Sequence, residues 1–417
     1  MLSLGIDLGT SGVRTAVMEG HRLIASAQAA HLVQPPGEID ASKWWEAVTT
    51  CLHRQVTALR EINRDPKEIA GIAVDGTSGS MVLTDADLNP VSQALMYNSA
   101  GFDAEAARIG QQVSAPHITL GSNSALARAM RLVSLAERKP AHLLHQADYI
   151  TAKLLGFGGV SDDNNTLKTG FDPQQERWPD WIANLIAPHL LPKVHRPGTP
   201  LGLIDPLVAK TLDLPGSATV HAGTTDSIAA FIAAAPQKEG VAVTSLGSTV
   251  AVKLLTRARV DDPSIGLYSH RIGDMWLVGG ASNTGGAVLK MFFSAEELAQ
   301  LSAQIKPDEP TGIQYYPLTG PGERFPVNDP TLQPHMTPRP ESDVIFLQAL
   351  FENMARIEAT CYREIEARGA IFPEALFTAG GGARNAAWTQ IRARQLGITP
   401  SPSRYTEAAI GAAMLVG

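Results

Sequence analysis

The chain has 417 residues, a length that exceeds one ordinary domain and fits two. Its formal net charge of −7 and its 18% content of charged residues give no basic field, so we expect no nucleic-acid partner. No apolar run reaches the ~18 residues that span a bilayer, and Cys51 and Cys361 are too few for a disulfide framework, so we expect a cytosolic protein with no membrane partner.

The first predicted element is a β-hairpin at the start of the chain. An apolar run over residues 2–6 leads to Asp7, a Gly/Thr/Ser turn follows, and residues 13–18 form a second strand-like run. Backbone N–H groups in such a turn can converge on an anion, because glycine has no Cβ to block the approach. Thr10 and Ser11 add hydroxyl donors, and Asp7 could hold Mg²⁺ through water. The turn suggests a phosphate clamp, with an ordinary hairpin as the alternative.

A second informative turn follows a predicted helix over residues 44–59 and a buried strand over residues 69–74. The strand runs into Asp75-Gly76-Thr77-Ser78-Gly79. Ligands of open α/β sheets bind at the carboxyl ends of strands, so this turn is well placed to contact a substrate. A plain polar turn is the alternative.

A predicted helical region over residues 125–156 precedes the polar run Ser161-Asp162-Asp163-Asn164-Asn165. Acidic and amide side chains in a row suggest a cation site, but the EF-hand spacing and its terminal Glu are missing. We therefore interpret the run as a solvated loop or the rim of a substrate site.

The next turn, Gly223-Thr224-Thr225-Asp226-Ser227, lies between a short strand over residues 218–222 and a helix. Asp226 stands where a helix N-cap belongs, and caps of this kind are common. A carboxylate on a strand-to-helix turn is also where a catalytic base would sit. The roles of cap and base both remain open at this point.

The second half of the chain repeats the pattern of the first hairpin. Residues 241–245 are an apolar run, Leu246-Gly247-Ser248-Thr249 is a turn of small residues, and residues 250–255 are again strand-like. Two such hairpins facing each other would grip a polyphosphate from both sides. That is the arrangement of the actin-like ATP-binding fold, and residues 236–240 fit a surface connection between two domains.

The last motif is a run of three glycines, Gly380-Gly381-Gly382, followed by Ala383, Arg384 and Asn385. It comes after a long amphipathic helix predicted over residues 344–367 and a strand over residues 376–379, and it opens a helix that contains Trp388 and ends at Gly397. Consecutive glycines at a helix N-terminus permit close contact with a planar or anionic ligand. Asn385 occupies the sixth position of G-x-G-x-x-G, so we reject a dinucleotide site.

Taken in order, these motifs resemble those of the FGGY carbohydrate kinases across almost the whole chain. The resemblance rests on Asp-x-Gly-Thr-Ser, Gly-Thr-Thr-Asp-Ser, Ser-Leu-Gly-Ser-Thr, Gly322-Glu323-Arg324 with Pro326, and Gly-Gly-Gly-Ala-Arg-Asn. Within the family the chain is most similar to a short cyanobacterial and plant-plastid group described as D-ribulose kinases. The resemblance implies an α/β fold of two actin-like (RNase H-like) ATPase domains with a cleft between them: a sugar-binding domain over residues 1–230 and a nucleotide-binding domain over residues 231–417.

The resemblance also assigns roles, with ATP and Mg²⁺ as cofactors and a small sugar as substrate. Asp226 would be the general base, and Asp7 would contact the sugar or a water-bound Mg²⁺. Ser78 and Asn98 would contact the sugar. The residues implied for ATP are Thr10, Ser11, Gly12, Arg14, Gly247, Ser248, Gly381, Gly382, Ala383, Arg384, Asn385 and Trp388.

Two departures from the family bear on the substrate. Many members hold the sugar with Trp-x-Asp-x-Arg, whereas this chain has Met96-Tyr97-Asn98-Ser99-Ala100. Typical xylulokinases have a Gln/His pair where this chain has Asp75-Gly76-Thr77-Ser78, which is closer to ribulokinases. We therefore expect D-ribulose to be phosphorylated to D-ribulose 5-phosphate.

Two alternatives stay open on the sequence: a D-xylulose or polyol kinase of the same family, and a non-kinase ATPase of the actin type. The bacterial cytosol is the expected location, or a plastid for a plant member. The sequence does not indicate the oligomeric state.

Overall fold

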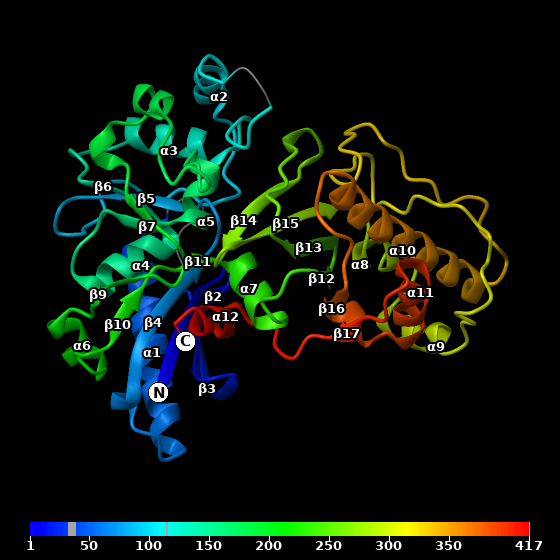
Figure 1. Ribbon diagram of the computed structural model, residues 1–417, viewed down its shortest axis with the longest axis horizontal. Coiled ribbons are helices and arrows are strands. Elements are labelled where there is room, and N and C mark those ends of the chain that lie inside the picture. Colours follow the sequence, from blue (N-terminus) through cyan, green and yellow to red (C-terminus); the bar gives the residue numbers. More distant parts are fainter. Residues whose placement is uncertain (32–38, 114–115, 417) are drawn as a thin grey trace. The chain divides into compact units, whose positions relative to one another are not determined.

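The computed structural model describes residues 1–31, 39–113 and 116–416, and the chain divides into two compact units (Figure 1). The first unit comprises Met1–Ala233 together with Glu407–Gly417, and the second comprises Ala234–Thr406. The division lies close to the boundary expected at residue 230. Residues 407–417 differ from the expectation, because this last segment packs with the first unit.

The first unit is built on a mixed sheet that begins with the predicted hairpin. Strands β1 and β2 are antiparallel, β3 extends the hairpin, and β4 lies parallel to β1 on its other side. The short strand β11 pairs with the end of β4. The strand order is β3 (Arg22–Ala30), β2 (Gly12–Glu19), β1 (Leu2–Leu8), β4 (Ile69–Gly76), β10 (Thr219–His221) and β9 (Pro200–Leu203), with β11 at Thr224–Thr225.

The alternation of side chains along β1 explains how the sheet is covered. Leu2, Leu4, Ile6 and Leu8 belong to the apolar core that also contains the inner residues of α1 (Ser42–Glu61). Gly5 and Asp7 point to the opposite face, where α12 (Ala408–Met414) packs, and Figure 1 shows this red helix among the blue strands. A Cβ at Gly5 would lie 1.9 Å from the carbonyl oxygen of Ala409, so only glycine allows this close approach.

Two segments of the first unit differ from the sequence predictions. The helical region expected over residues 125–156 is interrupted, because α3 (Ala125–Ser134) and α4 (Gln146–Leu155) are separated by β6 (His142–His145), which pairs with β5 (Met81–Thr84). The polar run at 161–165 is buried, ending β7 (Val160–Asp162) and forming α5 (Asp163–Thr166). Asp162 accepts hydrogen bonds from the backbone N–H groups of Asn164 and Asn165.

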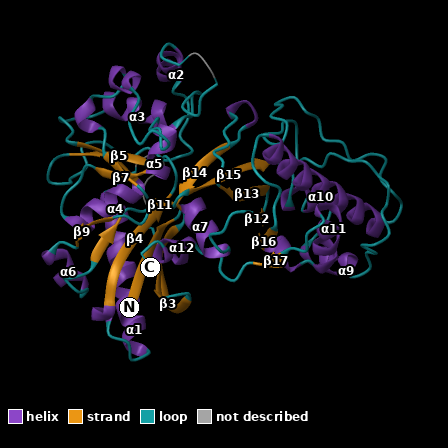
Figure 2. Ribbon diagram, in the orientation of Figure 1, coloured by secondary structure: helices purple, strands orange, loops and turns teal. Residues whose placement is uncertain are grey.

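The second unit repeats the topology of the first: an antiparallel hairpin, a third antiparallel strand, and a parallel strand on the far side of the first. Figure 2 shows its strands beside the long helix α10. The strand order is β14 (Tyr268–Ile272), β15 (Met275–Ser282), β13 (Val250–Thr256), β12 (Val241–Leu246), β16 (Ala375–Ala379) and β17 (Ser401–Pro402), and the helices are α8 (Gly286–Leu289), α9 (Ala295–Ser302), α10 (Asp343–Ala367) and α11 (Ala386–Leu396).

The remaining elements belong to the first unit: α2 (Asp103–Gly110), α6 (Pro206–Leu212), α7 (Asp226–Ala234) and β8 (Lys193–His195), although the last residue of α7 falls in the second unit. The predicted hairpins, the strand before the three glycines and the helices on both sides of it are confirmed, with boundaries that differ by one or two residues. Within the described residues, every helix is too short or too polar to cross a membrane.

A buried ion pair fixes the second unit behind its glycine loop. Arg392 of α11 donates two hydrogen bonds to Glu358 of α10, at 2.6 and 2.7 Å, and a third to the hydroxyl of Thr378 on β16. Glu358 also accepts a hydrogen bond from Thr244 of β12. Both charged side chains are fully buried and hydrogen-bonded to each other. Together with the two threonines they connect β12 and β16 to α10 and α11.

Candidate functional site

Three carboxylates gather at the carboxyl end of the sheet of the first unit. Asp7 on β1 and Asp75 on β4 are register partners on neighbouring parallel strands. Thr224 of β11 pairs with Asp75, and Asp226 begins α7 two residues later. The sequence predicted Asp7 and Asp226 as individual site residues, whereas it placed Asp75 only within a strand-end turn that was expected to contact a substrate.

Burial and mutual repulsion determine the charges of this cluster. Burial raises the pKa of Asp7, a hydrogen bond with Asp75 opposes that rise, and the charge of Asp226 adds to it. Burial holds the pKa of Asp75 well above its ordinary value, reinforced by the charges of Asp7 and Asp226. No N–H or hydroxyl donor among the described residues reaches either oxygen of Asp75. The pKa of both carboxyl groups is therefore raised, and that of the fully buried Asp75 is raised further.

Asp226 is half-buried and occupies the first turn of α7. Its Oδ1 accepts a hydrogen bond from the backbone N–H of Ser227 at 2.5 Å. The helix begins at Asp226, so this carboxylate lies at the N-terminal end of α7. The positive end of the helix favours the ionised form of its carboxylate.

Close backbone packing fixes the position of Asp226. A Cβ at Gly223 would lie 1.8 Å from the carbonyl oxygen of Val74, so the turn before Asp226 lies directly against β4. A Cβ at Gly411 of α12 would lie 1.7 Å from the carbonyl oxygen of Ala229, so α12 packs equally closely on α7. The C-terminal helix thus contacts both the strand that carries Asp7 and the helix that carries Asp226.

The buried polar run of α5 supports the same turn. The side-chain amide of Asn164 donates a hydrogen bond to the hydroxyl of Thr224 at 2.9 Å, and both residues are fully buried. The interpretation of this run as a solvated loop is wrong: its side chains anchor the strand that leads into Asp226. No pattern in the local sequence distinguishes these two possibilities, because both require polar residues.

The turn of the first hairpin presents its hydroxyls to solvent. Thr10 and Ser11 are exposed, and the turn is closed by a hydrogen bond from Gly9 N–H to the carbonyl of Gly12 at 3.0 Å. A Cβ at Gly12 would lie 2.4 Å from the carbonyl oxygen of Ala29 on β3. The close packing of β3 is therefore sufficient to explain a glycine at this position. The guanidinium of Arg14 lies 3.7 Å from Asp7.

Ser78 and Asn98, the two residues predicted to contact a sugar, lie on separate loops of the first unit. The hydroxyl of Ser78 is buried and has no hydrogen-bond partner among the described residues. Asn98 is exposed. The backbone N–H of Tyr97 donates to the hydroxyl of Ser80 at 3.0 Å, which brings the two loops together.

The second unit contains a pocket of about 770 Å³ at the turn of its hairpin and the glycine loop. Most of the residues predicted for ATP in this half line it, whereas Ala383 is not among them. The predicted residues in the lining are Gly247, Ser248, Gly381, Gly382, Arg384, Asn385 and Trp388.

The glycines of this pocket serve different purposes. A Cβ at Gly381 would meet nothing within 4 Å, and one at Gly247 would meet only the carbonyl oxygen of Thr249, at 3.8 Å. Both positions therefore keep the pocket open. Gly380 has a φ of +85°, and a Cβ at Gly382 would lie 2.7 Å from both Leu246 and Trp388, so the fold itself requires these two glycines.

Trp388 and Asn385 line the pocket at the N-terminal end of α11. The ring of Trp388 stacks on Phe351 with centroids 4.9 Å apart and planes 3° apart. Asn385 caps α11 by accepting a hydrogen bond from the backbone N–H of Trp388, and its amide donates to the hydroxyl of Ser302 on α9 at 2.8 Å. The exposed guanidinium of Arg384 adds a positive charge to the lining.

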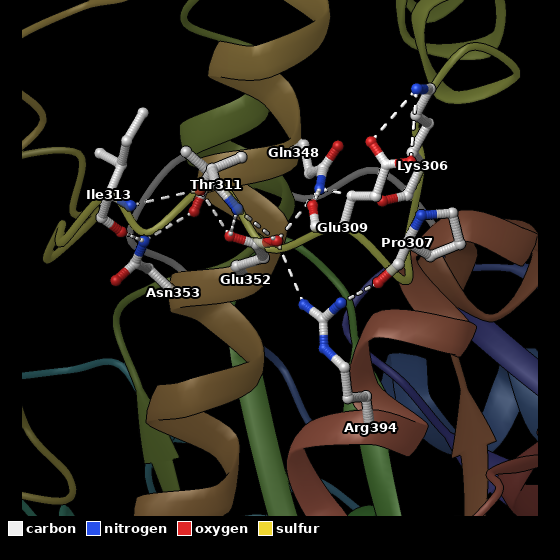
Figure 3. A network of polar contacts seen from close by, with 10 residues as sticks. Lys306, Pro307, Glu309, Thr311, Ile313, Gln348, Glu352, Asn353 and Arg394 are labelled. Carbon is white, nitrogen blue, oxygen red and sulfur yellow. Dashed lines mark hydrogen bonds and ion pairs between the residues drawn. The ribbon is translucent and has the colours of Figure 1, made fainter.

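Sequence reasoning missed one side of the pocket altogether. Lys290, after α8, and the small residues of α9 line it, and neither segment carries a motif. Figure 3 shows what supports this side: the carboxylate of Glu352 on α10 accepts hydrogen bonds from Thr311 and Arg394. The loop that follows α9 is thereby held against α10 and α11.

Glu323, in the Gly-Glu-Arg motif, has a structural role. Its buried carboxylate accepts hydrogen bonds from the hydroxyl of Ser282 and the backbone N–H of Asn283, both at 2.6 Å. These residues precede Gly285 and Gly286, which pack against the hairpin turn at Gly247. The motif thus holds the backbone behind the pocket.

Within the described residues, no group of three or more acidic, histidine or cysteine side chains is arranged to bind a metal ion directly. The oxygen donors at Asp7 and Asp226 are nevertheless of the kind that Mg²⁺ prefers. This donor set fits an ion that keeps most of its waters and arrives with a phosphate ligand.

Comparison with known proteins gives one family for the whole chain. Residues 2–233 match the N-terminal domain of the FGGY family of carbohydrate kinases, and residues 242–417 match its C-terminal domain. Both matches together cover nearly every residue.

The sequence identity between this chain and the individual relatives described here is below 30%. The chain is 28% identical to a xylulose kinase of Streptomyces rubiginosus over 299 residues, which are 66% of this chain and 59% of the relative, so it spans about three fifths of that protein's length. It is 24% identical to a xylulose kinase of Staphylococcus xylosus over 99% of this chain and 89% of the relative. Its fold matches the crystal structure of a xylulose kinase from Rhodospirillum rubrum with a TM-score of 0.85 at 20% identity, covering 100% of this chain and 89% of that one.

Proposed function

Because the chain belongs to the FGGY family of carbohydrate kinases, we propose that it transfers the γ-phosphoryl group of ATP to a hydroxyl group of a ketopentose. The observation that carries the proposal is the convergence of Asp7 and Asp226 at the carboxyl end of one sheet. An ionised carboxylate on a helix N-terminus, beside a second one, provides a base for a hydroxyl group and a contact for its sugar.

In the proposed reaction Asp226 is the general base. The sugar hydroxyl oxygen attacks the γ-phosphorus of ATP, its proton passes to an oxygen of Asp226, and the bond between the γ-phosphorus and the bridging oxygen breaks to release ADP. A weak base suffices, because the hydroxyl loses its proton late in a loose transition state. Phosphoryl transfer otherwise demands alignment and charge stabilisation, which the surrounding residues would supply.

The other predicted residues are assigned by their surroundings. Thr10, Ser11, Gly12 and Arg14 would lie along the path of the γ-phosphate, and the pocket at Gly247 and Gly381 would accept the rest of the nucleotide. Its volume suits a cofactor of that size. A bound Mg²⁺ would neutralise charge on the phosphate oxygens, with Asp7 contacting its water shell.

For the sugar we propose D-ribulose, phosphorylated at its terminal hydroxyl. The support is Ser78, whose buried hydroxyl has no partner among the described residues and can both donate and accept a hydrogen bond. D-xylulose is the second candidate, and the specific observation in its favour is the name xylulose kinase borne by the relatives described above.

An assay of ADP release over a panel of sugars tests the proposal. We expect ADP release to depend on a ketopentose, with D-ribulose giving the highest kcat/KM. ATP hydrolysis that is insensitive to every sugar would instead indicate a nucleotide switch of the actin type and would contradict the proposal.

A further inference from the structure

Arg128 of α3 is a buried cation without a carboxylate partner in the described part of the chain. The residue is only 2% exposed, and no ion pair to it is found among the described residues. Burial lowers the pKa of its guanidinium to about 10. Removing a charge from water without an opposite charge is costly, so other contacts must stabilise this side chain where it lies.

Those contacts are backbone carbonyl groups from three separate loops. Arg128 donates to the carbonyl oxygens of Gly79 at 2.8 Å, Tyr97 at 2.7 Å, Ser99 at 3.0 Å and Asn123 at 3.1 Å. Gly79 has a φ of +88°, and a Cβ there would lie 3.1 Å from the guanidinium. The turn at Gly79 therefore lies directly against Arg128 and is shaped to do so.

The carbonyl groups bound by Arg128 lie next to Ser78 and Asn98, the two residues predicted to contact the sugar. Gly79 directly follows Ser78, while Tyr97 and Ser99 flank Asn98 on both sides. One guanidinium thus fixes the backbone next to Ser78 and on each side of Asn98. The planar fork of arginine can satisfy several carbonyls at once, which a lysine ammonium on a flexible stem cannot reproduce.

We propose that Arg128 is a positioning residue for sugar specificity, which holds the loops of Ser78 and Asn98 at the separation that fits one ketopentose. This inference rests on the proposed function. Arg128 touches no substrate in this account: it acts through the backbone of the two loops. If either loop moves, its side chain no longer aligns with the sugar hydroxyl groups. The enzyme then discriminates less between two epimers of the ketopentose.

The test compares Arg128→Lys and Arg128→Gln with wild-type protein and with Arg131→Gln. Arg131 is the matched control: it lies one turn further along α3 and forms an ion pair with Glu105 at 2.6 Å. The measurements are KM for D-ribulose, D-xylulose and ATP, kcat, and the thermal unfolding transition. We expect Arg128→Gln to raise the KM of D-ribulose about tenfold and to reduce the preference between the two epimers, with the KM of ATP unchanged. Arg128→Lys should recover part of both effects, and Arg131→Gln should resemble wild type.

A double variant that combines Arg128→Gln with Ser78→Ala distinguishes positioning of the Ser78 loop from a general effect on the fold. If Arg128 acts through the Ser78 loop, its effect on epimer preference should shrink when the Ser78 hydroxyl is already absent. Additive effects, equal changes in the KM of sugar and ATP, or loss of cooperative unfolding in both Arg128 variants would assign the residue to the fold and overturn the inference. Wild-type protein that phosphorylates no sugar would instead refute the proposed function itself.

Discussion

Asp7 and Asp75 occupy the same register position on the parallel strands β1 and β4, where the charge of Asp7 adds to the burial that raises the pKa of Asp75. Asp75 is fully buried and Asp7 is 5% exposed, so the pair is separated from bulk water. Two carboxylates this close cannot both remain ionised without repulsion. Burial and the neighbouring charge therefore raise the pKa of Asp75, the more deeply buried member of the pair, well above its ordinary value.

Asp75→Asn should stabilise the protein at neutral and alkaline pH. The pKa of Asp75 is raised in the folded protein above its ordinary value of 3.8, so the folded state loses stability as the pH rises above that value. Asparagine has no proton to lose, and the gain should be on the order of 1 kcal/mol or more at pH 8, shrinking as the pH falls toward 4. Urea unfolding at several pH values measures it, with the exposed Asp87→Asn as control. If the variant is less stable than wild type at pH 8, the pKa of Asp75 is not raised in the folded protein.

Gly247→Val should block nucleotide binding without disturbing the fold. A Cβ there meets only one atom within 4 Å, and Gly247 lines the pocket, so the valine side chain would occupy space in it. We expect ATP to bind at least about tenfold more weakly, a loss of ~1.4 kcal/mol. Calorimetry with a non-hydrolysable ATP analogue measures the affinity. Gly320→Val is the matched control, because a Cβ at Gly320 meets nothing within 4 Å and Gly320 is not part of the pocket lining. Unchanged affinity in Gly247→Val would show that this turn does not hold the nucleotide.

Ser78→Ala should narrow the preference for D-ribulose over D-xylulose, its C3 epimer. The hydroxyl of Ser78 has no partner among the described residues, so its removal breaks no internal hydrogen bond and should leave the unfolding transition near its wild-type temperature. The ratio of kcat/KM values for the two sugars should fall at least about tenfold. If D-xylulose or glycerol is the better substrate of the wild-type protein, the assignment of D-ribulose is wrong, while the kinase assignment stands.

Asn164→Ala should lower kcat, because the hydrogen bond from Asn164 to Thr224 fixes the strand that leads into Asp226. A drop of about tenfold is expected from a small misplacement of the base, with little change in the KM of ATP. Thr224→Val removes the same bond from the other side and should have the same effect, whereas Thr224→Ser keeps the hydroxyl and should retain activity. Full kcat in both Asn164→Ala and Thr224→Val would show that this bond has no part in placing Asp226.

The sequence predicted those parts of the fold that local patterns determine. Apolar runs on both sides of a turn of small residues predicted the two hairpins, helical spacing predicted α1 and α10, and three consecutive glycines predicted the loop before α11. The side of the pocket formed by α9 was not predictable in this way, because α9 has a polar sequence and lines the pocket only through tertiary packing.

The same limit applies to the first unit. The packing of α12 against β1 depends on the absence of a side chain at Gly5, and its packing against α7 on the absence of one at Gly411. Nothing in the local sequence links these two residues. The burial of Asp162 and Asn164 was missed for a related reason. A run of polar residues predicts solvent exposure unless its hydrogen-bond partners, here backbone groups and Thr224, are known.

The most direct test of the kinase account is the initial rate of ADP release with and without a ketopentose, in wild-type protein and in Asp226→Asn. We expect ADP release that depends on D-ribulose in the wild type and falls at least ~10²-fold in the variant, as for loss of a general base. The variant should still unfold cooperatively. Near wild-type, sugar-dependent turnover in Asp226→Asn, or ADP release by the wild type that no sugar stimulates, would contradict the account.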